Sequence, residues 1–187
     1  MTNGDTEHAQ ALQPVEPEPG MLVHSSADRR LATEHWLLST HPTPRQARKE
    51  WTQDGIALLP LGTLFSAVRI PARLVHAAAS SEDPSTVDAF LTEALHGGPV
   101  ICDPRGRHYY ALVPASTASR WRHPAAECLG RDTYLGVPRL DAAGLDSRTW
   151  ASYWSVPMSS AAELCSPEAV SQIVVLGSFR AAEEGAE

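Results

Sequence analysis

Long apolar runs are missing from this sequence. A helix that crosses a membrane needs about 18 consecutive residues that are nearly all apolar, and no stretch of the 187-residue chain approaches this. The first thirty residues also lack the basic segment followed by an apolar segment that is typical of a secretory signal. We therefore expect a cytoplasmic protein without membrane contacts.

Cysteine is scarce, and its spacing argues against two common uses. Cys102, Cys128 and Cys165 are odd in number, widely separated and never in a C-x-x-C pair, so neither a disulfide framework nor a zinc ribbon is indicated. A soft-metal site would have to combine His108 and His123 with Cys102 and Cys128, but these separations match no zinc finger or knuckle. We expect reduced, mostly buried thiols and no bound metal.

Motifs of the common enzyme classes are also missing. There is no glycine-rich dinucleotide or P-loop sequence, because Gly97-Gly98 is expected to end a helix rather than open one. Serine hydrolase, zinc protease and zinc deaminase signatures are absent. No predicted strand carries the D-x-D or D-x-E pair typical of two-metal nucleotidyl transfer. Asp103 can face His108 across a predicted hairpin, although an aspartate in this position commonly caps its own turn. We expect neither catalytic residues nor a cofactor.

Lysine is almost absent, and the positive charge is unevenly distributed. Lys49 is the only lysine, and the formal net charge of −7 argues against a protein that coats nucleic acid. Residues 1–30 hold five acids against two arginines, and residues 180–187 hold three acids against one arginine. Residues 105–148, in contrast, hold seven arginines against four acids. The positive charge is therefore concentrated in the second half of the chain.

The two ends of the chain differ in composition from its middle. Residues 1–30 are acidic and proline-rich, and residues 180–187 are acidic. Such segments bury too little apolar surface to offset the entropy lost on ordering. Because 43% of all residues are apolar, the middle is large enough to form one core. We predict disordered tails at 1–30 and 180–187 around a single domain at 31–179.

Apolar periodicity and turn residues predict the elements of this domain. Thr43, Pro44 and Gly55 mark the start and end of one helix, and D-P-R-G marks a hairpin turn. Helices are predicted at 31–38, 44–54, 71–79, 84–95, 116–121 and 167–177, and strands at 56–60, 64–70, 99–103, 107–113, 133–138 and 150–157. The first two strands are expected to pair or to continue each other through a bulge. Because strands come in pairs, we predict an α+β fold, an antiparallel or mixed sheet with helices packed mainly on one face.

Aromatic side chains lie in or beside the arginine-rich half of the chain. Aromatic rings flanked by arginines are typical of proteins that hold single strands without reading their sequence. Alternatively, Trp150 and Trp154 fill the core face of a strand while the arginines form a solvated rim. If DNA is bound, we expect weak contacts to its backbone, with Trp121 as a stacking group. The candidate residues are Arg105, Arg107, Arg120, Trp121, Arg122 and Arg131.

Two runs of the sequence carry a resemblance. They are W-T-Q-D-G-I-A-L-L-P-L-G-T-L-F-S-A-V-R-I-P at 51–71 and G-G-P-V-I-C-D-P-R-G-R-H-Y-Y-A-L-V-P at 97–114. Both runs resemble part of the primase-polymerase-like proteins common in actinobacteria. Their span is about a third of the chain. Ser66 stands where that family often has aspartate, and the family's acidic metal-binding motif has no counterpart. The resemblance therefore implies a degenerate member without polymerase chemistry.

The pattern of the whole chain is also similar to that of small Streptomyces proteins, some of which are plasmid-borne replication activators of the Pra type. Y-L-G-V-P-R at 134–139 and W-A-S-Y-W-S-V-P-M at 150–158 belong to this pattern. The resemblance implies a non-catalytic accessory or regulatory protein of a mobile element, which promotes replication or gene expression through DNA and through replication or transcription proteins. Two alternatives stay open: a minimal nucleotidyltransferase whose acids converge in three dimensions, and a plain protein-interaction domain.

Overall fold

The computed structural model describes residues 15–18, 21–23, 25–147, 149 and 151–185. Much of the predicted N-terminal tail therefore lies outside the described residues, as do Trp150 and the last two residues. Within that tail, Val15–Glu18 (β1) and Met21–Val23 (β2) form an antiparallel pair.

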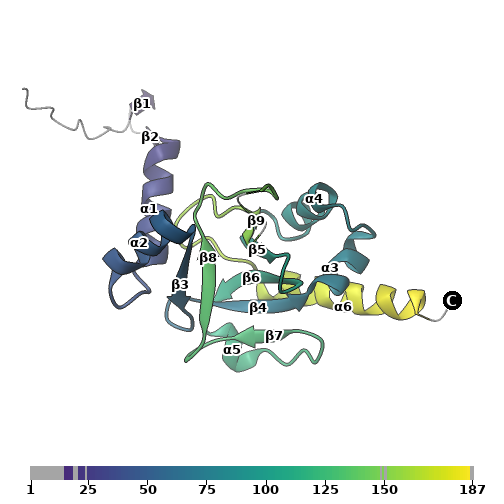
Figure 1. Cartoon of the computed structure of the whole chain (residues 1–187). Coiled ribbons are helices and arrows are strands. Elements are labelled where there is room, and N and C mark those ends of the chain that lie inside the picture. Colours follow the sequence, from purple (N-terminus) through teal and green to yellow (C-terminus); the bar gives the residue numbers. More distant parts are fainter. Residues whose placement is uncertain (1–14, 19–20, 24, 148, 150, 186–187) are drawn as a thin grey trace, which may run out of the picture.

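An antiparallel sheet forms the centre of the molecule (Figure 1). Its strand order is β7-β4-β6-β5-β9, and every neighbouring pair is antiparallel. The strands are β4 (Phe65–Pro71), β5 (Val100–Asp103), β6 (His108–Pro114), β7 (Glu127–Leu129) and β9 (Tyr153–Val156). The predicted hairpin is confirmed, because β5 and β6 pair directly.

The D-P-R-G turn of this hairpin has the contacts that its residue types favour. The backbone N–H of Gly106 donates to Oδ1 of Asp103 at 2.7 Å, so Asp103 caps the turn as expected. A side chain in place of Gly106 would run into the Asp103 carboxylate. Ala72, at the start of the helix that follows β4, donates its N–H to the Arg107 carbonyl at 2.8 Å, which anchors the turn to the helical layer.

Three helices cover one face of the sheet: α3 (Ala72–Ala79), α4 (Pro84–Ala94) and α6 (Pro167–Glu184). Leu74, Leu91 and Ile173 from these helices are buried with Val100 and Tyr109 from the sheet in one apolar cluster. The burial supplies the main driving force for docking the helices on the sheet.

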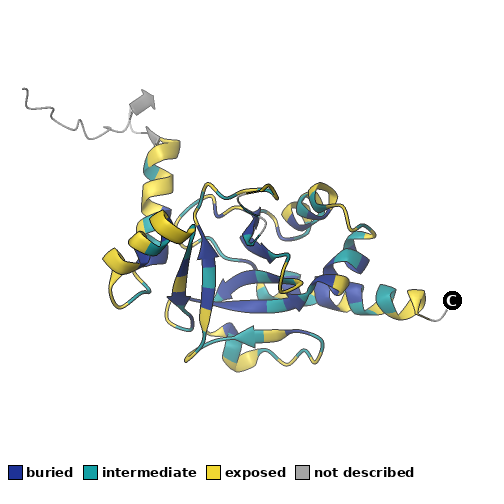
Figure 2. Ribbon diagram, viewed as in Figure 1, coloured by how far each residue is buried: buried dark blue, intermediate teal, exposed yellow. Residues whose placement is uncertain are grey.

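The opposite face of the sheet is covered by a second, smaller layer. Here β3 (Ile56–Pro60) pairs with β8 (Tyr134–Pro138), and α1 (Ser26–Leu38) and α2 (Pro44–Asp54) lie outside this pair. The expected pairing of β3 with β4 is wrong, because β3 leaves the central sheet and joins a strand far along the chain. The central strands are consequently buried on both faces (Figure 2).

The terminal helices extend past the bounds predicted for the core, 31–179. Helix α1 already begins at Ser26, because Ser25 and Asp28 form a reciprocal capping box. Helix α6 continues to Glu184. Both helices thus take in residues that composition alone assigns to the tails.

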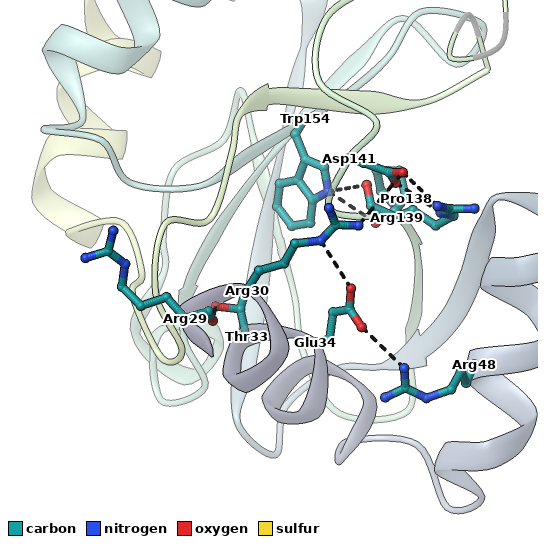
Figure 3. A network of polar contacts seen from close by, with 9 residues as sticks. All are labelled: Arg29, Arg30, Thr33, Glu34, Arg48, Pro138, Arg139, Asp141 and Trp154. Carbon is teal, nitrogen blue, oxygen red and sulfur yellow. Dashed lines mark hydrogen bonds and ion pairs between the residues drawn. The ribbon is translucent and has the colours of Figure 1, made fainter. Parts of the chain in front are cut away.

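Ion pairs tie α1 to α2 and to the segment after β8 (Figure 3). Glu34 accepts from Arg30 at 3.4 Å and from Arg48 at 3.3 Å. Arg30 also lies 3.9 Å from Asp141, which Arg139 holds at 2.7 Å. These side chains are all partly exposed, so each pair contributes at most about 1 kcal/mol.

The molecule is a single α+β domain with an antiparallel sheet, as predicted. None of the helices in the described ranges is long and apolar enough to cross a membrane.

Candidate nucleic-acid interface

The candidate site is built around a single helical turn, α5 (Thr117–Arg120), at the β7–β4 edge of the sheet (Figure 1). Trp121 ends this turn and donates its backbone N–H to the Thr117 carbonyl at 2.8 Å. The Arg122 guanidinium donates to the carbonyls of Trp121 at 2.7 Å and Ser119 at 2.9 Å. Arg122 therefore satisfies carbonyls at the end of the turn, which a four-residue helix cannot satisfy internally.

The ring of Trp121 is held in a fixed orientation. Its Nε1–H donates to the Ala126 carbonyl at 2.8 Å. The half-buried ring packs against the apolar cluster between the sheet and helices α3, α4 and α6. The His123 ring lies 6.3 Å away, centroid to centroid. The Trp121 side chain is thus positioned before any ligand arrives.

Two open cavities share Trp121, Arg122 and His123 as wall residues. We call them the Arg69 cavity, of about 450 Å³, and the Arg120 cavity, of about 560 Å³. The Arg69 cavity also includes His108 and Glu127 in its wall, and the Arg120 cavity includes Pro114, Thr117 and the first residues of α6. Trp121 therefore forms part of the wall of both cavities.

The charges in the two cavities are unequal. In the Arg69 cavity, Arg69 donates to Glu127 at 2.7 Å, so this pair is close to neutral. In the Arg120 cavity, Glu168 is the one acid among the described wall residues, which include Arg120 and Arg122. That carboxylate accepts from the Ser166 hydroxyl at 2.7 Å, and this hydrogen bond lowers the pKa of Glu168. Ser166 also caps α6, because its hydroxyl oxygen accepts the backbone N–H of Ala169 at 3.4 Å.

The other predicted contacts lie at the two ends of β4. Arg105 and Arg107 lie in the hairpin turn beside Pro71, the last residue of β4. Arg131 lies at the opposite end, in a cavity of about 490 Å³ that also includes Gly62. Seven strand residues separate the ends by about 20 Å.

Of the predicted contact residues, Arg120, Trp121 and Arg122 are adjacent in the chain and line one cavity, while the other arginines lie toward the two ends of β4. Ala118 connects the parts, because it lines both the Arg69 cavity and the cavity of Arg131. All the arginines concerned are exposed. We call this set the basic strip; its members are Arg105, Arg107, Arg120, Arg122 and Arg131.

The possible soft-metal residues are only partly brought together. His108, His123 and Cys128 line the Arg69 cavity, whereas Cys102 is buried in the core under the helices. In the described part of the chain, no group of three or more His, Cys, Asp or Glu side chains has an arrangement that could hold a metal ion. Burial raises the pKa of the Cys128 thiol to about 11.

A second polar cluster, which the sequence did not reveal, lies between α4 and β9. The hydroxyls of Ser155 and Tyr153 both donate to Oδ1 of Asp88, the latter at 3.4 Å. Burial raises the pKa of Cys102 to about 11, and burial also raises the pKa of Tyr109 and of Tyr153. These groups stay protonated at neutral pH and are poor nucleophiles there.

No known protein family, curated protein or solved structure matches this chain.

Proposed function

We propose that this chain is a non-catalytic, cytoplasmic accessory protein that binds DNA weakly along the basic strip and thereby promotes replication, or gene expression, of a mobile element. The observation that carries the proposal is the position of Arg120 and Arg122, which flank a fixed tryptophan in the chain: Arg122 lines both open cavities and Arg120 lines one of them. Replication or transcription proteins are the proposed protein partners.

The form of the strip favours contacts to phosphates over reading of bases. Exposed guanidinium groups neutralise phosphates and release counterions, which gives binding a steep dependence on salt. Helix α5 has only four residues, whereas helices that read a major groove present a longer surface to the bases. The net charge of −7 opposes binding, so we expect low affinity with little sequence preference.

The environment of Ser66 supports a role without polymerase chemistry. This residue is fully buried, and its hydroxyl donates to the Ala115 carbonyl at 3.2 Å. An aspartate at this position would direct a carboxylate at a carbonyl oxygen, and burying an unpaired charge is costly. Ser66 therefore has a structural use in place of the acid that the resembling family often carries.

The test is a salt series of binding to a fluorescent oligonucleotide, followed by anisotropy. Arg120→Glu and Arg131→Glu avoid the helix-capping role of Arg122, and each should weaken binding and flatten the salt slope by about one unit per lost contact. Arg45→Glu is the matched control, because Arg45 is exposed on α2 and lines none of the three cavities. Absence of binding by the parent at low salt, or equal losses in all three variants, contradicts the proposal.

A further inference from the structure

We infer that the ligand of this site is an unpaired nucleic-acid strand, with neighbouring bases placed in the Arg69 and Arg120 cavities on either side of Trp121. The inference rests on the proposed function and adds to it the strandedness of the ligand and the position of its bases.

The shape of the site is the first reason. The two cavities meet at Trp121, Arg122 and His123 and therefore accept adjacent groups of one extended ligand. Their volumes, about 450 and 560 Å³, lie in the range of about 300–1,000 Å³ that is usual for pockets that bind small molecules. A base that remains paired in a duplex cannot enter a hollow of this kind without leaving its stack.

The chemistry of the walls is the second reason. Trp121 and His123 line both cavities, and aromatic rings hold bases of any sequence by stacking. In the Arg120 cavity, Ser116, Thr117 and Ser171 supply hydroxyl groups that donate and accept hydrogen bonds. These hydroxyl groups can therefore form hydrogen bonds with the edges of different bases, without selecting one base.

The arrangement of charge is the third reason. Arg120 and Arg122 directly flank Trp121 in sequence, so positive groups lie within one residue of the stacking ring. Stacked bases joined by a charged backbone match this alternation of ring and guanidinium. A duplex would reach only the arginines, since its bases are turned inward.

Three probes of equal length, about 12 nucleotides, separate these cases: oligothymidylate, the same backbone without bases, and a duplex. We expect the parent to bind oligothymidylate about tenfold more tightly than either other probe, since stacking adds to the phosphate contacts. Trp121→Leu should remove this preference and leave the affinity for the base-free backbone nearly unchanged. Trp121→Phe should keep most of the preference, because it retains an aromatic ring that can stack. This variant loses the hydrogen bond to Ala126.

Trp36→Leu is the matched control, because Trp36 is also half-buried but lies on α1. Equal binding of all three probes by the parent, or equal loss of preference in the Phe and Leu variants of Trp121, overturns this inference and leaves the proposed function in place. Binding of none of the probes at low salt overturns both. If Trp121→Leu lowers the melting temperature too far for measurement, the preference of the parent among the three probes decides the question.

Discussion

Asp88 is a charged residue in an unfavourable place, half-buried between α4 and β9. Burial raises the pKa of its carboxyl group, and the nearby charge of Asp83 adds to this, while the hydrogen bonds from Ser155 and Tyr153 act in the opposite direction. Cys102 and Tyr109 complete its surroundings from β5 and β6. A carboxyl pKa that is higher in the folded state favours the protonated form, so the stability it contributes is lost as pH rises through the folded pKa.

Two substitutions at Asp88 separate its charge from its hydrogen bonds. Asp88→Asn keeps an acceptor oxygen for Ser155 and removes the buried charge, so we expect it to be at least as stable as the parent near pH 7 and less dependent on pH. Asp88→Ala leaves the hydroxyl of Ser155, which is 5% exposed, without its acceptor, and should cost about 1–3 kcal/mol. Urea unfolding at neutral and mildly acidic pH measures both. An Asn variant no more stable than the Ala variant would show that the charge itself is required.

At the scale of helices and strands, one glycine allows the close packing of α3 against α6. A Cβ on Gly177 would overlap the carbonyl oxygen of Leu74, which belongs to the backbone of α3 and cannot turn aside. The two helices can therefore approach so closely only with glycine in this position.

Gly177→Ala tests this packing because two effects oppose each other. Alanine favours an isolated helix by about 1 kcal/mol, but the overlap should force the helices apart and cost about 1–3 kcal/mol or more. We expect a net loss of stability in urea unfolding. Gly185→Ala at the end of α6 is the control, since its Cβ would have ordinary contacts of 3.6 and 3.9 Å. A Gly177→Ala variant more stable than the parent contradicts the observed approach of α3 to α6.

Elements with local signals could be predicted from the sequence, and pairings between distant segments could not. Gly55 ends α2 with a φ of 75°, and the Asp103 turn forms the β5–β6 hairpin, because each signal lies within a few residues of the structure it sets. The pairing of 56–60 with 134–138 has no such signal, since alternation shows that a strand is half-buried but not which strand lies beside it. The three-residue strand β7 is too short to produce a pattern.

The same distinction holds for the site. Clustered charge in the sequence made the adjacent residues Arg120, Trp121 and Arg122 candidates, and all three line one cavity. The cavities depend on how α5 lies against β4, β7 and the start of α6, and therefore on long-range packing. The Asp88 cluster was missed because its members come from separate elements of the chain.

At the scale of the whole molecule, the remaining question is whether separated carboxylates act together in phosphoryl chemistry. Two-metal nucleotidyl transfer needs acids that hold ions about 4 Å apart, and within the described residues no cluster of three or more metal-binding side chains was found. Ser66 is used for a hydrogen bond to Ala115. We therefore expect purified protein with a primed template, nucleotides and Mg²⁺ or Mn²⁺ to incorporate nothing, in an assay where an added polymerase does extend the primer. Template-dependent incorporation that disappears in Asp103→Asn or Asp141→Asn, while Asp54→Asn retains it, would contradict this expectation. It would favour the alternative of a minimal nucleotidyltransferase.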